Sequence, residues 1–381
     1  MWIDNILKQK KCIFALSPMA DMTDSPFCQI VREIGGVDIV FREMVSSEAI
    51  VRDNVKTMGM TDFVPAERPI VQQIFGSYPL TMAKAAATVM EHTNPEGIDI
   101  NMGCPVYKIT SNFNGCALMK DPDLAARIIR EVKTAIGKTP LSIKIRLGWS
   151  DPDDFKTFIP VIENAGANLI TIHGRTKTQG YSGKSDWERI RQAKEIACVP
   201  VLANGDIHEP HQVQRALDTT QADGVLIARG ALGNPWFFRY INYELCEFAN
   251  YEYPDSQTQT IRNSFIVSLE ERVRIVLNHA RLHLAHYGKR GIVTFRKHLS
   301  WYFKPNRISS LIYTKIHERE NMCTTPVPQF REFSKIKEVR VKLMQVKTLS
   351  ELESILLELH TPALEFQSQH IFPIGKICFK K

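Results

Sequence analysis

The first 250 residues alternate short apolar, β-branched segments with longer segments of helical periodicity. The short segments are too apolar to be exposed to water on either face, which is typical of buried parallel strands. The pattern predicts eight strands, at Ile13–Ser17, Val37–Phe41, Ile70–Ile74, Gly97–Asn101, Leu141–Arg146, Leu169–His173, Pro200–Asn204 and Gly224–Ala228. Between them it predicts helices over Leu80–Glu91, Pro122–Ile136, Phe155–Ala165, Trp187–Ile196 and Gln212–Leu217.

Eight strand–helix units in about 250 residues are typical of a (β/α)8 or TIM barrel. An open, doubly wound sheet is the alternative, but no GxGxxG motif follows the first predicted strand. We therefore predict an α/β TIM barrel over residues 1–248, followed by a smaller C-terminal helical domain over residues 249–360. Residues 361–381 have no clear periodicity and are predicted to form a tail. The helices expected in the second domain are 266–288, Ile292–Tyr302, Lys335–Leu343 and Leu349–Leu359.

The overall composition is that of a globular protein: 44% of the 381 residues are hydrophobic and 23% are charged. No apolar run approaches the roughly 18 residues that a membrane-spanning helix needs. The first residues lack the apolar stretch and cleavage site of a signal peptide, so we expect a cytoplasmic protein with no membrane partner. Eight scattered cysteines without a CxxC pair predict neither a metal site nor a disulfide framework.

The charge is unevenly distributed along the chain. Residues 251–381 contain 21 Lys and Arg against 12 Asp and Glu, a net charge of +9, whereas residues 1–250 contain 27 against 29. A basic domain joined to a nearly neutral one indicates a polyanionic partner such as a nucleic acid. A well-solvated basic helical surface is the alternative explanation.

Polar residues follow or end several of the predicted strands, and in TIM barrels the functional residues lie at this end. Gln73, Lys144 and His173 occur in the third, fifth and sixth strands. The sequences Asn204-Gly205-Asp206 and Ala228-Arg229-Gly230 place small residues where backbone N–H groups can approach a phosphate. A phosphate there, with a ring held at the barrel centre by Gln73 and Lys144, would suit flavin mononucleotide. Each of these features alone has a structural explanation. Asn204-Gly205-Asp206 could be a turn, Lys144 could form an ion pair in the barrel interior, and His173 could be a hydrogen-bonded histidine at a strand end.

Cys104 differs from the other cysteines in its position. It follows Asn101-Met102-Gly103 and precedes Pro105, which predicts a tight turn above the barrel mouth. A thiol at that place can act on a bound substrate as an acid or a nucleophile. The alternative is that Cys104 is a small buried hydrophobic residue. Cys116, twelve residues further on, is predicted to be structural.

Taken in order, these motifs resemble those of the tRNA-dihydrouridine synthase family, and they are most similar to its bacterial B-type branch. The resemblance extends over about residues 13–305. It rests on Leu16-Ser17-Pro18-Met19-Ala20, Glu43-Met44-Val45-Ser46, Gln73-Ile74-Phe75-Gly76, Asn101-Met102-Gly103-Cys104-Pro105, Ile143-Lys144-Ile145-Arg146, His173-Gly174-Arg175-Thr176, Gln179-Gly180-Tyr181-Ser182-Gly183, Ala231-Leu232-Gly233-Asn234-Pro235-Trp236 and Arg296-Lys297-His298-Leu299-Ser300-Trp301-Tyr302.

The resemblance implies an FMN-binding barrel that, with its helical domain, grips tRNA and needs no metal and no obligatory protein partner. NADPH would reduce the flavin, whose N5 would pass a hydride to C6 of a uracil extruded from the RNA. The family's cysteine, which maps onto Cys104, would protonate C5 from the opposite face. By the same resemblance, Asn101 and Arg175 would contact or orient the uracil. The implied FMN-binding residues are Pro18, Met19, Ala20, Gln73, Lys144, His173, Asn204, Gly205, Asp206, Ala228 and Arg229.

Four positions depart from the family pattern. Asp21 and Ala228 stand where a glycine is usual, Arg42 stands where a threonine is frequent, and Cys116 replaces a serine or alanine. None of the four removes a catalytic group, so they affect the expected substrate position and flavin geometry rather than the reaction.

Two other functions remain open on the sequence. An FMN barrel that oxidises or reduces a small molecule would share the phosphate loops, but it would not need a basic helical domain. A non-catalytic tRNA-binding protein could retain the fold, although the joint presence of Cys104, Lys144 and His173 argues against it.

Overall fold

The computed structural model describes residues 1–10, 12–241, 267–304 and 338–358. The chain divides into two compact units, Met1–Gln257 and Thr258–Lys381, which we describe separately. The domain boundary predicted at residue 248 and the predicted tail lie outside the described residues. No helix in the described part of the chain is both long enough and apolar enough to cross a membrane.

The first unit contains a closed barrel of eight parallel strands in sequence order, with β8 paired to β1. This confirms the predicted TIM barrel. The strands are β1 (Ile13–Leu16), β2 (Ile39–Ser46), β3 (Ile70–Phe75), β4 (Gly97–Met102), β5 (Leu141–Arg146), β6 (Leu169–His173), β7 (Val201–Asn204) and β8 (Gly224–Ile227).

Strand β2 differs most from its prediction, because it continues well past Phe41 to Ser46. The register of β2 against β3 shifts between Arg42 and Val45, which marks a β-bulge or a similar irregularity. The strand therefore continues through the polar Arg42-Glu43 pair, which ends the apolar run in the sequence.

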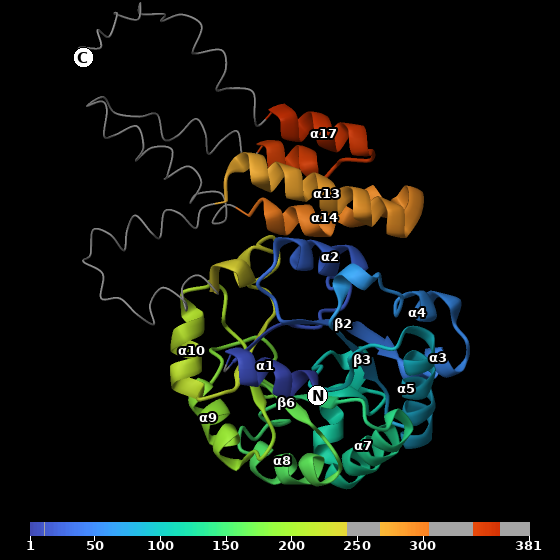
Figure 1. Cartoon of the computed structure of the whole chain (residues 1–381), viewed down its shortest axis with the longest axis vertical. Coiled ribbons are helices and arrows are strands. Elements are labelled where there is room, and N and C mark those ends of the chain that lie inside the picture. Colours follow the sequence, from blue (N-terminus) through green and yellow to red (C-terminus); the bar gives the residue numbers. More distant parts are fainter. Residues whose placement is uncertain (11, 242–266, 305–337, 359–381) are drawn as a thin grey trace, which may run out of the picture. The chain divides into compact units, whose positions relative to one another are not determined.

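Helices surround the strands (Figure 1), as the alternating pattern predicts. Two of the predicted helices have an aspartate as N-cap. The side chain of Asp121 accepts a hydrogen bond from the N–H of Leu124, and that of Asp186 accepts one from the N–H of Arg189. The predicted helices correspond to α5 (Pro79–Thr93), α7 (Pro122–Ile136), α8 (Phe155–Asn164), α9 (Trp187–Ile196) and α10 (Gln212–Thr220).

Several helical segments were not predicted, most of them because they are short or lack an apolar periodicity of their own. They are α1 (Trp2–Lys10), α2 (Ser25–Ile34), α3 (Ser47–Val51), α4 (Val55–Gly59), α6 (Tyr107–Thr110) and the 3-10 turns η1 (Pro65–Glu67) and η2 (Gly115–Lys120). The segment Ser25–Ile34 is the exception, since its apolar residues do recur with a helical period.

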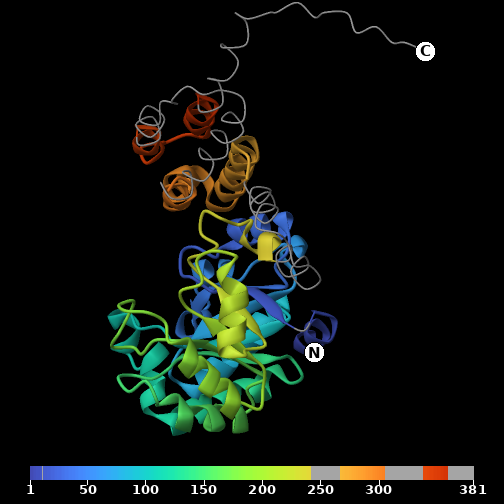
Figure 2. The ribbon, with the colours of Figure 1, turned by 90° about the vertical axis from the view of Figure 1, so that its left-hand side faces the viewer.

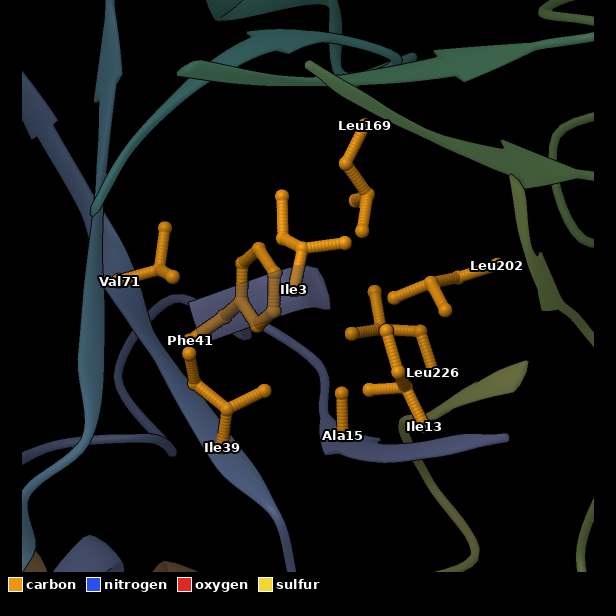
Figure 3. Close-up of a cluster of buried hydrophobic side chains, with 9 residues drawn as sticks. All are labelled: Ile3, Ile13, Ala15, Ile39, Phe41, Val71, Leu169, Leu202 and Leu226. Atoms are coloured by element: carbon orange, nitrogen blue, oxygen red, sulfur yellow. The ribbon is translucent and has the colours of Figure 1, made fainter. Parts of the chain in front are cut away.

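Helix α1 closes the end of the barrel at which the strands begin. The side chain of Ile3 is 1% exposed and points among the inward-facing side chains of the strands (Figure 3). In Figure 2, α1 lies on one side of the barrel, and loops extend from the other side. The cluster around Ile3 consists of Ile13, Ala15, Ile39, Phe41, Val71, Leu169, Leu202 and Leu226.

The described part of the second unit is helical, as predicted, and contains no strand. Helix α13 (Leu269–Tyr287) packs against α14 (Gly291–Tyr302) and α17 (Leu349–Glu358), with the 3-10 turn η3 (Gly288–Arg290) between the first two. Residues 338–343 are also helical. The Arg296 side chain donates hydrogen bonds from Nε and Nη2 to the carbonyl oxygen of Val346, at 2.9 and 2.6 Å, and so links segments far apart in the sequence.

We predict that Ile3→Ala lowers the free energy of unfolding by about 2 to 5 kcal/mol, because it removes buried methyl groups and leaves a cavity in the barrel interior. Urea unfolding followed by circular dichroism measures the change. Asn5→Ala is the matched control, since Asn5 is an exposed residue of the same helix. Equal effects of the two substitutions would show that α1 does not close the barrel.

Candidate active site

The interior of the barrel changes from apolar to polar along its axis. Each strand directs every second side chain inward, and the positions near the strand beginnings form the apolar cluster around Ile3. Two residues further along, the same faces carry polar side chains, such as Gln73 after Val71 in β3 and Thr171 after Leu169 in β6. The polar side chains at inward positions include Gln73, Asp99, Asn101, Ser142, Lys144, Arg146, Thr171, His173 and Asn204.

Cys104 lies in a tight turn immediately after β4. The Oδ1 atom of Asn101 accepts hydrogen bonds from the N–H groups of Gly103 and Cys104, at 3.2 and 2.9 Å. The carbonyl oxygen of Cys104 accepts a further bond from the N–H of Cys116, at 3.1 Å. The turn therefore holds the thiol at the end of the barrel where the strands finish.

The thiol environments of the other described cysteines differ from that of Cys104, which is half-buried at this turn. Cys28 and Cys116 are fully buried, and burial raises the pKa of the Cys116 thiol to about 12. Burial also raises the pKa of Cys12 to about 11, and Cys12 precedes β1 at the opposite end of the barrel. Cys198 is exposed in the segment before β7. Among the described cysteines, Cys104 is the one placed to act in the barrel mouth.

Arg146, which the sequence marks as a charge inside an apolar strand, connects two loops at the mouth. Its Nε donates to the carbonyl oxygen of Gly103 at 2.9 Å, and its Nη1 donates to those of Thr176 and Gly180, each at 2.8 Å. The side chain is 2% exposed. Arg146 therefore fixes the Cys104 turn relative to the loop that follows β6.

Lys144 and His173 lie at the polar end of the barrel interior. Burial, with a contribution from Arg146, lowers the pKa of Lys144 to about 8, and its Nζ donates to Oδ1 of Asn204 at 3.3 Å. Burial and the neighbouring Lys144 hold the pKa of His173 well below its usual range. Nη1 of Arg175 lies 3.3 Å from Nε2 of His173 and can only donate, so the neutral imidazole carries its proton on Nδ1.

Arg175 and Asp206 join the loops after β6 and β7. Nη2 of Arg175 donates to Oδ2 of Asp206 at 2.7 Å and to the carbonyl oxygen of Gly183 at 2.6 Å. Burial raises the pKa of Asp206, but hydrogen bonds from the Ser185 N–H and from Arg175 outweigh this effect, so the pKa lies below its usual value. The guanidinium of Arg175 is 2% exposed and is already engaged by protein atoms. In this structure Arg175 orients loops, and its predicted contact with a substrate stays a prediction.

The ends of β7 and β8 form a backbone cradle that suits an anion. Gly205 adopts a φ of +114°, and a Cβ there would lie 2.5 Å from Oγ of Ser185, so only glycine fits. A Cβ at Gly230 would lie 2.6 Å from the carbonyl oxygen of Ile207. Among the described hydrogen bonds, none is donated by the N–H groups of Gly205, Asp206, Ala228 and Arg229. Unused N–H groups of this kind are the donors that phosphate oxygens require.

The segment after β1 lines the same mouth. Pro18 and Met19 are half-buried and Ala20 is exposed, and the N–H of Met19 donates to Oγ1 of Thr23 at 2.8 Å. The structure therefore places at the barrel mouth the residues that the sequence predicted there, from the Pro18 segment to Arg229. It adds Ser142, and it supplies partners for Asp99 and Arg146, to which the sequence assigned no role in the site. Their signal was a polar residue at an inward position of an apolar strand, in the same register as Gln73 and Asn101.

Comparison with known proteins gives this site a context. The family model described as dihydrouridine synthase matches residues 15–337, which is more than half of the chain. The chain belongs to the dihydrouridine synthase family. A protein of Rickettsia bellii named probable tRNA-dihydrouridine synthase is 34% identical over 290 residues, covering 75% of this chain and 84% of that protein. The tRNA-dihydrouridine synthase B of Pseudomonas syringae pv. tomato is 34% identical over 313 residues, covering 81% and 88%.

A solved structure with a similar fold is more distant in sequence. The old yellow enzyme homologue of Zymomonas mobilis superposes with a TM-score of 0.46 at 14% identity, covering 61% of this chain and 88% of that one. At this level the likeness carries no argument about the site.

The structure explains two of the four departures from the family pattern. Asp21 has a φ of +60°, the left-handed conformation that favours glycine, and its N–H donates to Oε2 of Glu43 at 2.8 Å. Arg42 follows the inward-facing Phe41 and so points out of the barrel, where it forms a buried ion pair with Glu67 at 3.1 Å. The Arg42 side chain therefore does not reach into the barrel mouth. At Ala228 the backbone does not adopt the left-handed conformation, so nothing in it requires glycine.

We predict that Gly205→Ala destabilises this family member more strongly than Gly183→Ala. Both glycines have a positive φ, but a Cβ at Gly183 meets nothing within 4 Å, whereas one at Gly205 lies 2.5 Å from Ser185 Oγ and 2.7 Å from His173 Cδ2. The two variants therefore differ in the steric contact and also in the backbone strain, which is larger at the φ of +114° of Gly205 than at the +68° of Gly183. Urea unfolding of both variants measures the difference, which we expect to be about 1 to 3 kcal/mol. A difference near zero would mean that the cradle tolerates a side chain.

Proposed function

We propose that this protein is a flavin-dependent tRNA-dihydrouridine synthase, which uses NADPH to reduce the C5=C6 bond of uridines in tRNA. The observation that carries the proposal is the Cys104 thiol, held by Asn101 in the turn above a polar, partly cationic barrel interior. Membership of the dihydrouridine synthase family supports it, as do relatives named for this activity.

The residues present fit FMN as the cofactor. The N–H groups at Gly205, Asp206, Ala228 and Arg229 would hold its phosphate, and the Asp206 carboxylate is turned to Arg175 rather than to the cradle. Lys144, Gln73, His173 and Asn204 would surround its ring at the polar end of the barrel, and the Pro18–Ala20 segment would line its edge. When bound and reduced by NADPH, FMN supplies a hydride for C6 of the uracil.

The protein's own task is to supply the proton. Reduction of C5=C6 adds a hydride at C6 and a proton at C5, so a donor is needed in addition to the cofactor. As a general acid, the Cys104 thiol would transfer the proton of its Sγ to C5. Asn101 orients the turn that carries the thiol and would also contact the uracil. Arg175 would act on the uracil only through the loop that it holds.

The side chains on the loops around the barrel mouth also agree with the proposed substrate. A base stacked in RNA cannot enter a barrel, so the target uridine must be extruded. Two exposed aromatic residues stand on the loops around the entrance, Tyr107 after β4 at 81% exposure and Tyr181 after β6 at 62%. Exposed aromatic rings are surfaces on which unstacked bases pack. The net charge of +9 in residues 251–381 supplies the attraction for the tRNA backbone.

An anaerobic experiment tests the function in one measurement. The purified protein is reduced with NADPH, unmodified tRNA is added, and the flavin absorbance is followed. We expect prompt reoxidation that depends on tRNA. A reduced flavin that ignores tRNA from the matching organism would favour an oxidoreductase for a small molecule, and absence of bound flavin would favour a non-catalytic tRNA-binding protein.

We predict that Cys104→Ala reduces turnover of unmodified tRNA by about 10²- to 10⁴-fold, the usual contribution of a general acid. Reduction of the flavin by NADPH and the affinity for tRNA should stay unchanged, because only the proton donor is removed. Single-turnover reoxidation of the reduced flavin measures the first effect, and filter binding measures the affinity.

Two other thiols provide matched controls for this substitution. Cys116→Ala removes the neighbouring thiol, which is a poor acid because its pKa is about 12, and Cys198→Ser removes an exposed one. Both variants should turn over at close to the wild-type rate. If Cys116→Ala were the damaging variant and Cys104→Ala were active, the assignment of the proton donor would be wrong.

A further inference from the structure

We propose that Asp99 is a positioning residue: through Gln73 and Asn101 it fixes the direction of a hydrogen-bond chain that holds the Cys104 turn. This inference rests on the proposed function of the site. Asp99 itself lies one layer below the mouth and is 0% exposed, so it acts through its neighbours rather than on a substrate.

The chain begins at a buried carboxylate between two neighbouring strands. Gln73, Asp99 and Ser142 are paired in register across β3, β4 and β5. Oδ2 of Asp99 accepts a hydrogen bond from Nε2 of Gln73 at 2.5 Å, and Oδ1 accepts one from Oγ of Ser142 at 2.6 Å. Both carboxylate oxygens are thus held by side chains of the barrel interior.

The chain continues to the turn without a gap. Oε1 of Gln73 accepts a hydrogen bond from Nδ2 of Asn101 at 2.9 Å. Oδ1 of Asn101 then accepts from the N–H groups of Gly103 and Cys104. Four consecutive links therefore connect Ser142, deep in the barrel wall, with the backbone of the proposed proton donor.

The direction of every link follows from the first one. An ionised carboxylate can only accept, so Gln73 must present its NH₂ group to Asp99 and its carbonyl oxygen to Asn101. Asn101 must then present its NH₂ group to Gln73, which leaves its oxygen for the two backbone donors. If Gln73 turned around, Asn101 would have to turn as well, and its NH₂ group would face the N–H groups of Gly103 and Cys104.

The negative charge of Asp99 and its ability to accept a hydrogen bond from Gln73 are separate properties. Burial raises the pKa of Asp99 to about 7, and the hydrogen bonds from Gln73 and Ser142 and the nearby Lys144 oppose that rise. The Ser142 hydroxyl can rotate to accept a bond, so a protonated Asp99 can donate to Ser142 and still accept from Gln73. The chain therefore needs an acceptor opposite Gln73, and a negative charge is not required.

The alternative role for Asp99 is that of a counter-charge to Lys144. Asp99→Asn separates the two roles, because it removes the charge but keeps an oxygen that can face Gln73 while its NH₂ group donates to Ser142. Asp99→Leu removes both. We expect kcat on tRNA to stay within about threefold of wild type for Asp99→Asn and to fall about 10- to 100-fold for Asp99→Leu, the cost of a misplaced catalytic group. KM for tRNA should not change.

A double substitution gives the sharper test and does not depend on Asp99→Leu folding. Ser142→Ala alone should be mild, because Asp99 still accepts from Gln73. In the Asp99→Asn/Ser142→Ala protein, the amide of residue 99 loses the acceptor for its NH₂ group, which can then be satisfied only by turning to Gln73. We expect the combined loss in kcat to exceed the product of the two single losses by about tenfold or more.

A readout independent of turnover accompanies these measurements. The rate at which iodoacetamide alkylates Cys104, followed by mass spectrometry of the peptide in flavin-free and flavin-loaded protein, reports on the turn itself. It should rise several-fold in Asp99→Leu and in the double variant, and stay near wild type in both mild single variants. Thr171→Val is the matched control, since Thr171 is a buried inward-facing residue that is not part of the chain.

The outcomes separate the inference from the proposed function. If Asp99→Asn is as damaging as Asp99→Leu, Asp99 acts by charge and the inference is overturned. The inference is also overturned if the loss of kcat in the double variant equals the product of the two single losses and the alkylation rate of Cys104 is unchanged. If the wild type shows no tRNA-dependent turnover, the proposed function fails, and the alkylation rates still decide whether the chain controls the turn.

Discussion

The structure depends on one geometric constraint, the alternation of inward and outward side chains in eight parallel strands that share a register. This alternation determines whether each inward position holds an apolar or a polar residue, because the barrel interior is dry where α1 closes it and open where the strands end. Apolar residues fill the closed end around Ile3. Polar residues at the other end acquire their partners from neighbouring strands, and a change of one residue in register would turn both the apolar core and the polar site out of the barrel.

Buried charges at the polar end are tolerated because each is linked to a loop or a strand that it orders. Arg146 is held by three backbone carbonyl oxygens, and Arg175 by a carboxylate and two carbonyl oxygens. Burial of an ion costs several kcal/mol, which hydrogen bonds of this quality offset only in part. These residues therefore lower the stability that an apolar interior would have, and in return they fix the loops from which the proposed catalytic groups project.

Much of the fold could be predicted from the sequence, because a buried strand and an amphipathic helix each have a local signature. The strands and the outer helices have that signature, and their predicted ends lie close to the observed ones, except in β2. Helix α1 could not be predicted in the same way. Its apolar residues Trp2, Ile3, Ile6 and Leu7 lie in a short segment, and what makes them buried is the open end of a barrel that forms far along the chain.

The candidate site was predictable in its members but not in their roles. Cys104, Lys144 and His173 stand out by residue type and by position at strand ends. The direction of the Asp206 carboxylate, toward Arg175 and Ser185, depends on loops that meet only in the folded chain. The role of Asp99 could not be predicted for the same reason. Its hydrogen-bond partners, Gln73 and Ser142, lie 26 and 43 residues away in the sequence.

The arrangement of charge around the cradle shows why an aspartate can stand in a proposed phosphate site. Asp206 would repel a phosphate if its carboxylate were turned toward the cradle. It accepts instead from Arg175 at 2.7 Å, while Arg229, whose side chain is 42% exposed, lies 3.7 Å from its other oxygen. Two guanidinium groups thus share one carboxylate, which leaves a net positive charge beside the free N–H groups. Asp206 also accepts a hydrogen bond from the N–H of Ser185, which packs against Gly205, so this acidic residue helps to keep the cradle in shape.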